Sequence, residues 1–402
     1  MPNIVGVEVA KTSILCCTVD SSQLPSDLAK FARSYTPVTL LSNISGLQTL
    51  LELGSHYVIE PTGDYSKIWI DLLQANEKTV LRVNPRRMAA LKMLSGITSK
   101  TDRYDGAFLA LYGAINYTNP EAFLSEYAED LREAVLDHSF ISRMAGNHQR
   151  RLWQLLAREW PEACRTANGT KPQQNRKFLA SQPTGLWRFI AGEDIAPRFQ
   201  AEREAQLSES IGCGLSELSR TLAAQVCEME RRQYPIEQRI SQLLEKPEFE
   251  PYHKVFELFG FGVMTRASIL ARVFPFHQFL DVDGKPIRLV VPSTKSDRRH
   301  RRNKSLNAFR LALGNGTRLY QSGQLEKRKP AGPSQPRSAL FLHVKSKIVI
   351  PSGKGFICGP HYLKQHADFY HSLPTKMAHK QKVMKTVGRV VKDLYRALLA
   401  GL

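Results

Sequence analysis

The chain has 402 residues, 42% hydrophobic and 23% charged, the balance of an ordinary globular protein with room for two or three domains. No run of about 18 apolar residues occurs, which excludes a membrane-spanning helix, and the start of the chain has no basic and apolar leader, so we expect no secretory signal. The net charge of +19 predicts an acidic partner.

The first 125 residues read as short β-rich runs alternating with helical patterns. The strand candidates are residues 4–9, 13–19, 56–59 and 79–83, of which the first two are able to form a hairpin. A helical pattern through Ile68, Leu72 and Leu73 separates the last two runs. Strands that alternate with helices predict an α/β sheet domain over residues 1–125.

Four acidic residues occupy suggestive places in this domain. Glu8 lies within the first strand candidate, Glu60 follows a later one, and Asp102 and Asp105 are spaced to share one face of the next helix. Each has a structural alternative, since an Asp near a helix start is usually a cap. Together they predict a site for Mg²⁺ (or Mn²⁺), because phosphodiester chemistry needs several carboxylates around such ions.

Residues 126–248 are predicted to be helical. Apolar residues between Leu215 and Leu243 recur every three or four positions and form a coiled-coil-like seam, in which Pro235 is expected to kink or divide the helix. The seam fits packing within its own domain as well as pairing between protomers. A loop is expected at residues 166–183, which are rich in Asn, Gln, Lys and Pro.

The excess positive charge belongs to the last third of the chain. Residues 285–402 hold 25 Lys and Arg against 4 Asp and Glu, whereas residues 1–284 hold 31 against 33. This polarity favours a nucleic-acid surface in a basic, mostly helical domain over residues 249–402. Its first helical hairpin contains Gly260 and Gly262, where backbone N–H groups could approach a phosphate, the alternative being a plain helix–helix turn.

The acidic residues stand in motifs that resemble a known family. Residues 5–11, 59–65, 83–85 and 100–105 are similar to segments of the DEDD transposases of the insertion-sequence-110 (Piv/MooV invertase) family. The resemblance implies a RuvC-like RNase H fold for the N-terminal domain and metal binding by four acids. Glu60, Asp102 and Asp105 match three of these acids, and Glu8 stands where the family has Asp, one methylene shorter.

The resemblance extends to residues 259–271 and onward into the C-terminal domain, where the family carries a catalytic serine. Ser296 is the best positional match for that nucleophile, and Ser293 is the alternative. A serine followed by arginines suits attack on a phosphate whose developing charge the guanidinium groups stabilise. The residues predicted to contact nucleic acid are Gly260, Gly262, Lys295, Arg298, Arg299, Arg301, Arg302, Lys304 and Arg310.

The resemblance implies a transposase or DNA recombinase that acts on donor and target DNA, with a structured non-coding guide RNA, as a homo-oligomer (dimer or tetramer). Six scattered cysteines without CxxC spacing predict reduced thiols, consistent with a bacterial, nucleoid-associated protein of the cytoplasm. Two alternatives remain: a RuvC-like metal-dependent nuclease of the junction-resolvase type that uses water, and a non-catalytic nucleic-acid-binding descendant. Transposition and inversion also stay open.

Overall fold

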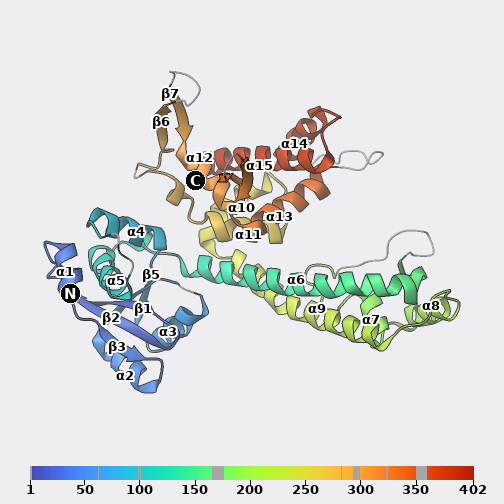
Figure 1. Ribbon diagram of the computed structural model, residues 1–402, viewed down its shortest axis with the longest axis horizontal. Coiled ribbons are helices and arrows are strands. Elements are labelled where there is room, and N and C mark those ends of the chain that lie inside the picture. Colours follow the sequence, from blue (N-terminus) through green and yellow to red (C-terminus); the bar gives the residue numbers. More distant parts are fainter. Residues whose placement is uncertain are drawn as a thin grey trace. The chain divides into compact units, whose positions relative to one another are not determined.

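A computed structural model describes residues 2–61, 63–97, 99, 101–164, 176–281, 283–292, 299–322, 325–349 and 360–402. The chain divides into two compact units, residues 1–126 and 127–402 (Figure 1). The first unit is a mixed α/β domain and the second is mostly helical, which confirms the predicted fold class at this level. Within the ranges described, no helix is long and apolar enough to cross a bilayer.

The sheet of the first unit has five strands: β1 (Asn3–Val9), β2 (Ser13–Asp20), β3 (Val38–Leu41), β4 (His56–Ile59) and β5 (Thr79–Arg82). Their order is β3-β2-β1-β4-β5. The pairs β1–β2 and β2–β3 are antiparallel, whereas β1–β4 and β4–β5 are parallel. The predicted hairpin and both later strands are confirmed, but β3, an edge strand of four residues, was not predicted.

Helices cover both faces of this sheet. They are α1 (Leu28–Ser34), α2 (Ile44–Leu53), α3 (Asp64–Ala75), α4 (Pro85–Leu94) and α5 (Asp102–Asn116). One apolar cluster joins Ile4 and Val58 to the buried side of α5. The other joins Val5 and Val7 to residues of α2 and α3. The alternation along β1 therefore assigns even-numbered residues to the α5 face.

Helix α5 lies on β1 with no side chain between the two backbones. A methyl group on Gly6 would lie 2.3 Å from both the carbonyl oxygen of Gly106 and the amide nitrogen of Ala110. One on Gly113 would lie 2.3 Å from Cγ2 of Val58. These distances are far inside van der Waals contact, so only glycine permits this approach. The start of α5 is thereby held over the end of β1.

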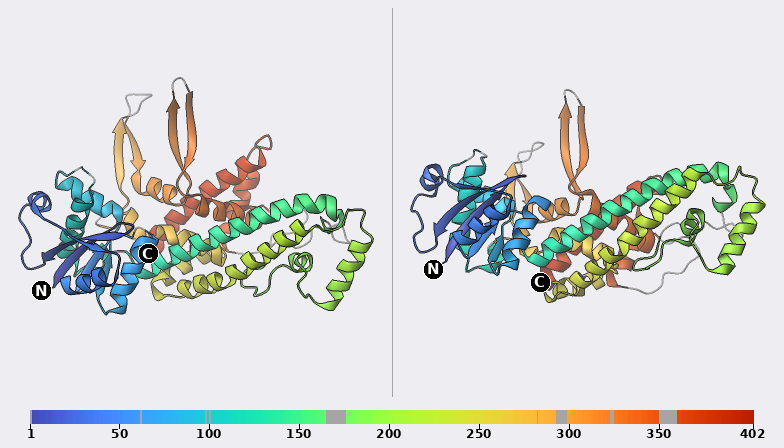
Figure 2. Two further views of the ribbon diagram at one scale, coloured as in Figure 1. Left: turned by 60° about the horizontal axis from the view of Figure 1, so that its bottom comes forward. Right: turned by 90° about the horizontal axis from the view of Figure 1, so that it is seen from below.

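The second unit begins with a long helical hairpin. Helices α6 (Glu126–Glu159) and α9 (Glu217–Leu244) lie side by side, with α7 (Gly185–Ala191) and α8 (Pro197–Ser208) near their far end (Figures 1 and 2). Gln233 of α9 donates to Ser142 of α6 at 3.0 Å. The seam thus packs within its own chain, and α9 runs through Pro235 as one helix, so of the predicted kink or division the division does not occur. The described part of the predicted loop, 176–183, is irregular.

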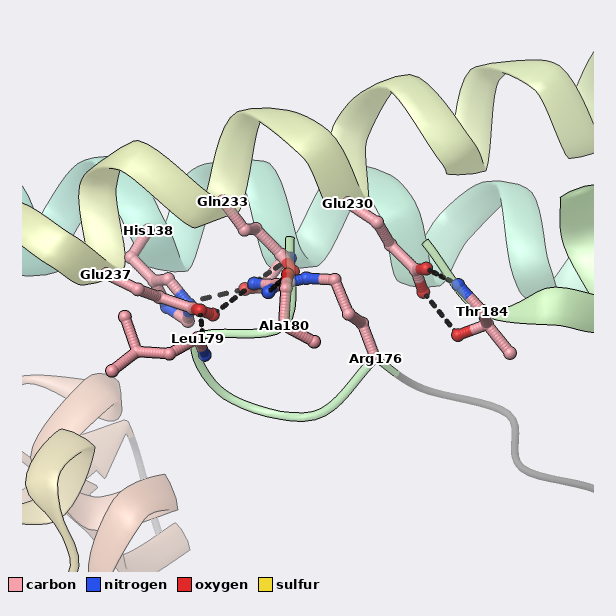
Figure 3. A network of polar contacts seen from close by, with 9 residues as sticks. His138, Arg176, Leu179, Ala180, Thr184, Glu230, Gln233 and Glu237 are labelled. Atoms are coloured by element: carbon pink, nitrogen blue, oxygen red, sulfur yellow. Dashed lines mark hydrogen bonds and ion pairs between the residues drawn. The ribbon is translucent and has the colours of Figure 1, made fainter. Parts of the chain in front are cut away.

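Two buried carboxylates of α9 hold this irregular segment against the hairpin (Figure 3). Glu237 accepts hydrogen bonds from the Leu179 amide at 2.7 Å and from His138 at 3.2 Å, and it forms an ion pair with Arg176, which is 2% exposed. Burial would raise the pKa of Glu237, but these donors outweigh it and hold the pKa below its ordinary value. The pair therefore stabilises the folded hairpin near neutral pH.

Glu230 lies two turns earlier in α9, and its surroundings shift its pKa in the opposite direction. It accepts from the Thr184 amide at 2.7 Å and from the Thr184 hydroxyl at 3.2 Å. Burial raises its pKa above the ordinary value, although the hydrogen bonds from Thr184 and the charge of Arg176 oppose the shift. Its ionised form is thus disfavoured, so its contribution to stability falls as the pH rises through the raised pKa.

The remainder of the second unit is a group of helices from which two β-ribbons project. The helices are α10 (Glu250–Glu257), α11 (Val263–Val273), α12 (Lys304–Ala312), α13 (Ser334–His343), α14 (His361–Ser372) and α15 (His379–Gly401). The first ribbon pairs β6 (Arg288–Pro292) with β7 (Arg299–Asn303), and the second pairs β8 (Gly316–Ser322) with β9 (Leu325–Ala331).

Along both units, short 3-10 or π segments lie at Pro120–Ala122, Pro161–Cys164, Pro247–Phe249, Phe276–Phe279 and Val344–Ile348.

The predicted helical hairpin that contains Gly260 and Gly262 is confirmed as α10 and α11. Within the domain predicted to be mostly helical, the basic residues Arg299 to Asn303 instead form strand β7, which pairs with β6. Its arginines gave no strand signal, since charged residues are not typical of strands.

We predict that Gly6→Ala lowers the free energy of unfolding by about 1–3 kcal/mol, because α5 must move to admit the methyl group. Gly146→Ala is the matched control: it lies inside α6, where the new methyl group would meet only Arg150 at 3.7 Å. This control should raise stability by about 0.5–1 kcal/mol. Chemical denaturation of the full chain measures both, and equal effects would contradict the close contact.

We predict that Glu237→Gln destabilises the protein by about 3–5 kcal/mol at pH 7, since it leaves the buried Arg176 without its charged partner. Glu230→Gln should change stability by less than about 1 kcal/mol, because glutamine keeps an acceptor for Thr184. Thermal unfolding compares the two variants. The deficit of Glu237→Gln should shrink as the pH falls below about 4.3, where the unfolded carboxylate takes up a proton; a deficit independent of pH would argue against the ion pair.

Candidate active site

Glu8 and Glu60 come from neighbouring parallel strands. Val7 of β1 pairs with Ile59 of β4, so Glu8 and Glu60 are the next residues on each strand. Val7 and Ile59 belong to the apolar cluster on the far side from α5. Because successive side chains alternate, Glu8 and Glu60 are assigned to the α5 face at the carboxyl ends of the two strands.

Asp102 and Asp105 form the first turn of α5. Thr101 caps this helix, its hydroxyl accepting from the Tyr104 amide at 3.4 Å. Two carboxylates in the first turn complement the positive end of the helix dipole. A Cβ on Gly106 would lie only 3.8 Å from Cβ of Glu8. The close seating of α5 on β1 therefore brings the first turn of α5 next to the strand ends.

The fold thus brings four acidic positions from three distant segments to one edge of the sheet. Carboxylate oxygens are the donors that Mg²⁺ and Mn²⁺ prefer, so the residue types fit such an ion. In this conformation Asp102 is exposed and Glu8, Glu60 and Asp105 are half-buried. In the part of the chain that the structure describes, no three His, Cys, Asp or Glu side chains stand close enough together to hold a metal ion.

A lysine that the sequence did not indicate lies in this site. Lys92 of α4 forms an ion pair with Asp105, and the two side chains are 13% and 18% exposed. Its ammonium group neutralises one of the four carboxylates. No motif marks Lys92, because it lies in an ordinary helical run and meets Asp105 only through the packing of α4 on α5. A basic residue in the helix before the Asp pair indicates an ion pair only once the packing of α4 on α5 is known.

The predicted nucleophile lies outside the described residues. Ser296, its alternative Ser293, and the neighbouring Lys295 and Arg298 fall in 293–298, which follow Pro292 in sequence. The ends of the flanking strands are adjacent, since Pro292 of β6 pairs with Arg299 of β7.

The other predicted contacts to nucleic acid are distributed over β7 and α12. Arg299 and Arg301 occupy positions in β7, and Arg302 follows them as an exposed residue. Lys304 is exposed at the start of α12, and Arg310 is half-buried in its last turn. The sequence of β7 contains three arginines in five residues, a composition that suits binding to phosphate.

In the turn that contains Gly260 and Gly262, Gly260 has a structural role. Gly260 has φ +64° and its amide donates to the Glu257 carbonyl at 3.0 Å. A methyl group there would lie 3.1 Å from Pro360 and Leu363, so the turn packs against the start of α14. Gly262 is exposed at the N-cap of α11. Phosphate contact at this turn stays a prediction.

A family of known proteins is similar to the N-terminal part of the chain. Residues 5–161 match the family model of the DEDD transposases of insertion sequence 110, described as Transposase. The match begins in β1, contains all four acidic positions, and continues just past the end of α6. No curated protein gives a significant match to the chain. The N-terminal part of the chain, residues 5–161, is thus similar to the DEDD transposases of insertion sequence 110.

Proposed function

We propose that this transposase cuts and rejoins DNA by combining the acidic site of the first unit with a serine nucleophile of the second. The observation that carries the proposal is the convergence of Glu8, Glu60 and the first turn of α5 inside the segment that matches the family. We assign the sheet to the RuvC-like RNase H fold. Its order β3-β2-β1-β4-β5, antiparallel on one side of β1 and parallel on the other, supports this assignment.

Glu8, Glu60, Asp102 and Asp105 would hold Mg²⁺ or Mn²⁺, which would polarise the scissile phosphate. The chain's own contribution is to place these carboxylates. The first turn of α5 presents Asp102 and Asp105, and β1 and β4 present the two glutamates at the same edge. Lys92 balances the charge of Asp105 in this conformation.

In the proposed reaction the hydroxyl oxygen of Ser296 bonds to the scissile phosphorus, and the bond from that phosphorus to a sugar oxygen breaks. The serine proton is lost to solvent or a base, and the leaving sugar oxygen is protonated. Attack by a hydroxyl of the partner strand reverses these changes and reseals the DNA. Exchange between donor and target requires two duplexes and more than one protomer, so we include a homo-oligomer (dimer or tetramer) and a structured guide RNA in the proposal.

The test of the nucleophile uses the full chain with its co-purifying RNA, DNA flanking the element, and Mg²⁺. We expect a protein–DNA adduct that survives a denaturing gel and disappears in Ser296→Ala, because no other group forms the phosphoserine bond. Ser293→Ala is the matched control and should keep the adduct. Asp102→Asn should lower cleavage about 100-fold or more, since the acidic site stabilises charge in the transition state by several kcal/mol.

The other outcomes of this experiment select the alternatives. Cleavage without any adduct in the unmodified chain would mean a water-using nuclease of the junction-resolvase type. If DNA is bound but never cut, even by the Glu8→Asp variant, the chain is a non-catalytic binding protein and the proposal is wrong.

A separate prediction concerns Lys92. Because its ammonium group competes with a divalent cation for Asp105, we expect Lys92→Ala to bind Mn²⁺ about three- to tenfold more tightly, the worth of roughly 1 kcal/mol for a partly buried ion pair. Lys92→Arg keeps the positive charge and should change the affinity little. Titration of Mn²⁺ followed by electron paramagnetic resonance gives the dissociation constants. Weaker binding by Lys92→Ala would instead show that the lysine orients Asp105 for the metal.

A further inference from the structure

The second ribbon, β8–β9, is a projecting element that the acidic site and the serine do not use. Its strands have seven residues each and pair from Gly316↔Ala331 to Ser322↔Leu325. Its main neighbour beyond its own strands is α12. Figure 2 shows the first and second ribbons rising from the same side of the helical core. At about 3.4 Å per residue, seven residues reach roughly 24 Å, well beyond what a turn between two helices requires.

The base of the second ribbon is tightly fixed. Gly314 and Gly332 have φ +69° and +89°, and a methyl group on either would lie 2.0 Å from a backbone oxygen of the facing segment. Arg337 donates to three carbonyls at this point, those of Gly314 (2.6 Å), Gly332 (3.0 Å) and Ala331 (3.3 Å). The ribbon is therefore held in a set direction, which lowers the entropy lost when it binds.

Helix α12 connects the two ribbons and is anchored in the core. Phe309 is fully buried, with ring centroids 5.4 Å from those of Phe279 and Tyr395. At the base of the first ribbon, Ser305 of α12 accepts from the Ile287 amide at 2.8 Å. One rigid helix thus supports both ribbons.

The second ribbon is basic. Residues 316–331 contain Arg318, Lys327, Arg328 and Lys329 against a single acid, Glu326. Arg318 pairs with Lys329 in the register, so these two cations lie beside each other on one face of the ribbon. Arg318 and Lys329 are exposed near its base.

These properties fit double-stranded DNA better than double-stranded RNA. The major groove of B-DNA, about 12 Å wide, admits a two-stranded ribbon. The major groove of A-form RNA is too deep and narrow for one. Cations on such a ribbon would meet phosphates at the groove edges and release counterions.

We propose that the β8–β9 ribbon is a second DNA-binding element, which enters the major groove of a duplex with its Arg318–Lys329 face on the phosphate backbone. The proposal rests on the proposed function for its substrate class and adds a contact outside the acidic site, the serine and the first ribbon.

The test measures binding of the full chain to one DNA duplex, and to an RNA duplex of the same sequence, by fluorescence anisotropy at several salt concentrations without divalent metal. The variant Arg318→Gln/Lys329→Gln removes two cations from the ribbon. The matched control, Arg232→Gln/Lys254→Gln, removes two exposed cations from α9 and α10 that form only i,i+4 ion pairs. The ribbon variant should bind DNA more weakly and lose about 1.8 from the slope of log affinity against log salt, about 0.9 for each phosphate contact. The control should keep the slope.

A second measurement does not depend on lost charge. A photo-crosslinking residue at the exposed ribbon position Thr317 should attach to the DNA duplex, whereas one at Lys254 should not. An unchanged slope, an equal loss in the control, a loss confined to RNA, or no crosslink at Thr317 would each overturn the proposal. If the wild-type protein binds and cuts DNA and the ribbon variant binds DNA equally well, only the proposed role of the ribbon is wrong. Wild-type protein that binds no DNA rejects the proposed function itself.

Discussion

The direct contact of helix α5 with strand β1 is the constraint on which the candidate site depends. Gly6 lets the two backbones meet, since a methyl group there would lie 2.3 Å from the Gly106 carbonyl oxygen and the Ala110 amide nitrogen. The start of α5 consequently lies within a few ångströms of Glu8, and its first turn brings Asp102 and Asp105 to the end of the sheet. A residue with a side chain at Gly6 would separate the acids although none of them had changed. The packing of one helix thus sets the chemistry of this domain.

Charge is divided between the two parts of the molecule in a way that matches their proposed tasks. The α/β domain concentrates carboxylates at one sheet edge, where a single lysine, Lys92, balances Asp105. Residues 285–402 carry the excess positive charge, and part of it belongs to the sequences of the two ribbons. The proposed metal site and the proposed phosphate-binding surface would thus be built from different segments of the chain. In the proposed function both act on the same DNA.

In the long helical hairpin, buried polar groups fix the position of the irregular segment along an otherwise apolar seam. Glu230 and Glu237 take buried positions that apolar residues usually occupy in such helices. Each is satisfied by donors from the irregular segment around Leu179 and Thr184, so the segment has one favourable place along α9. Because an unpaired buried carboxylate is costly, the hydrogen bonds specify the register of this segment as well as stabilising it.

By itself the sequence determined what depends on local pattern. Alternating apolar runs predicted the β1–β2 hairpin and β4, the three-and-four spacing predicted α9, and the motifs around Glu60 and Asp102 identified the family. The tertiary structure alone decided what depends on contacts between distant segments. These are the pairing of the short edge strand β3, the undivided course of α9 through Pro235, the ion pair of Lys92 with Asp105, and the strands formed by the basic C-terminal segments. The physical reason is the same in each case: the stabilising partner lies far away in the sequence, so no local pattern carries its signal.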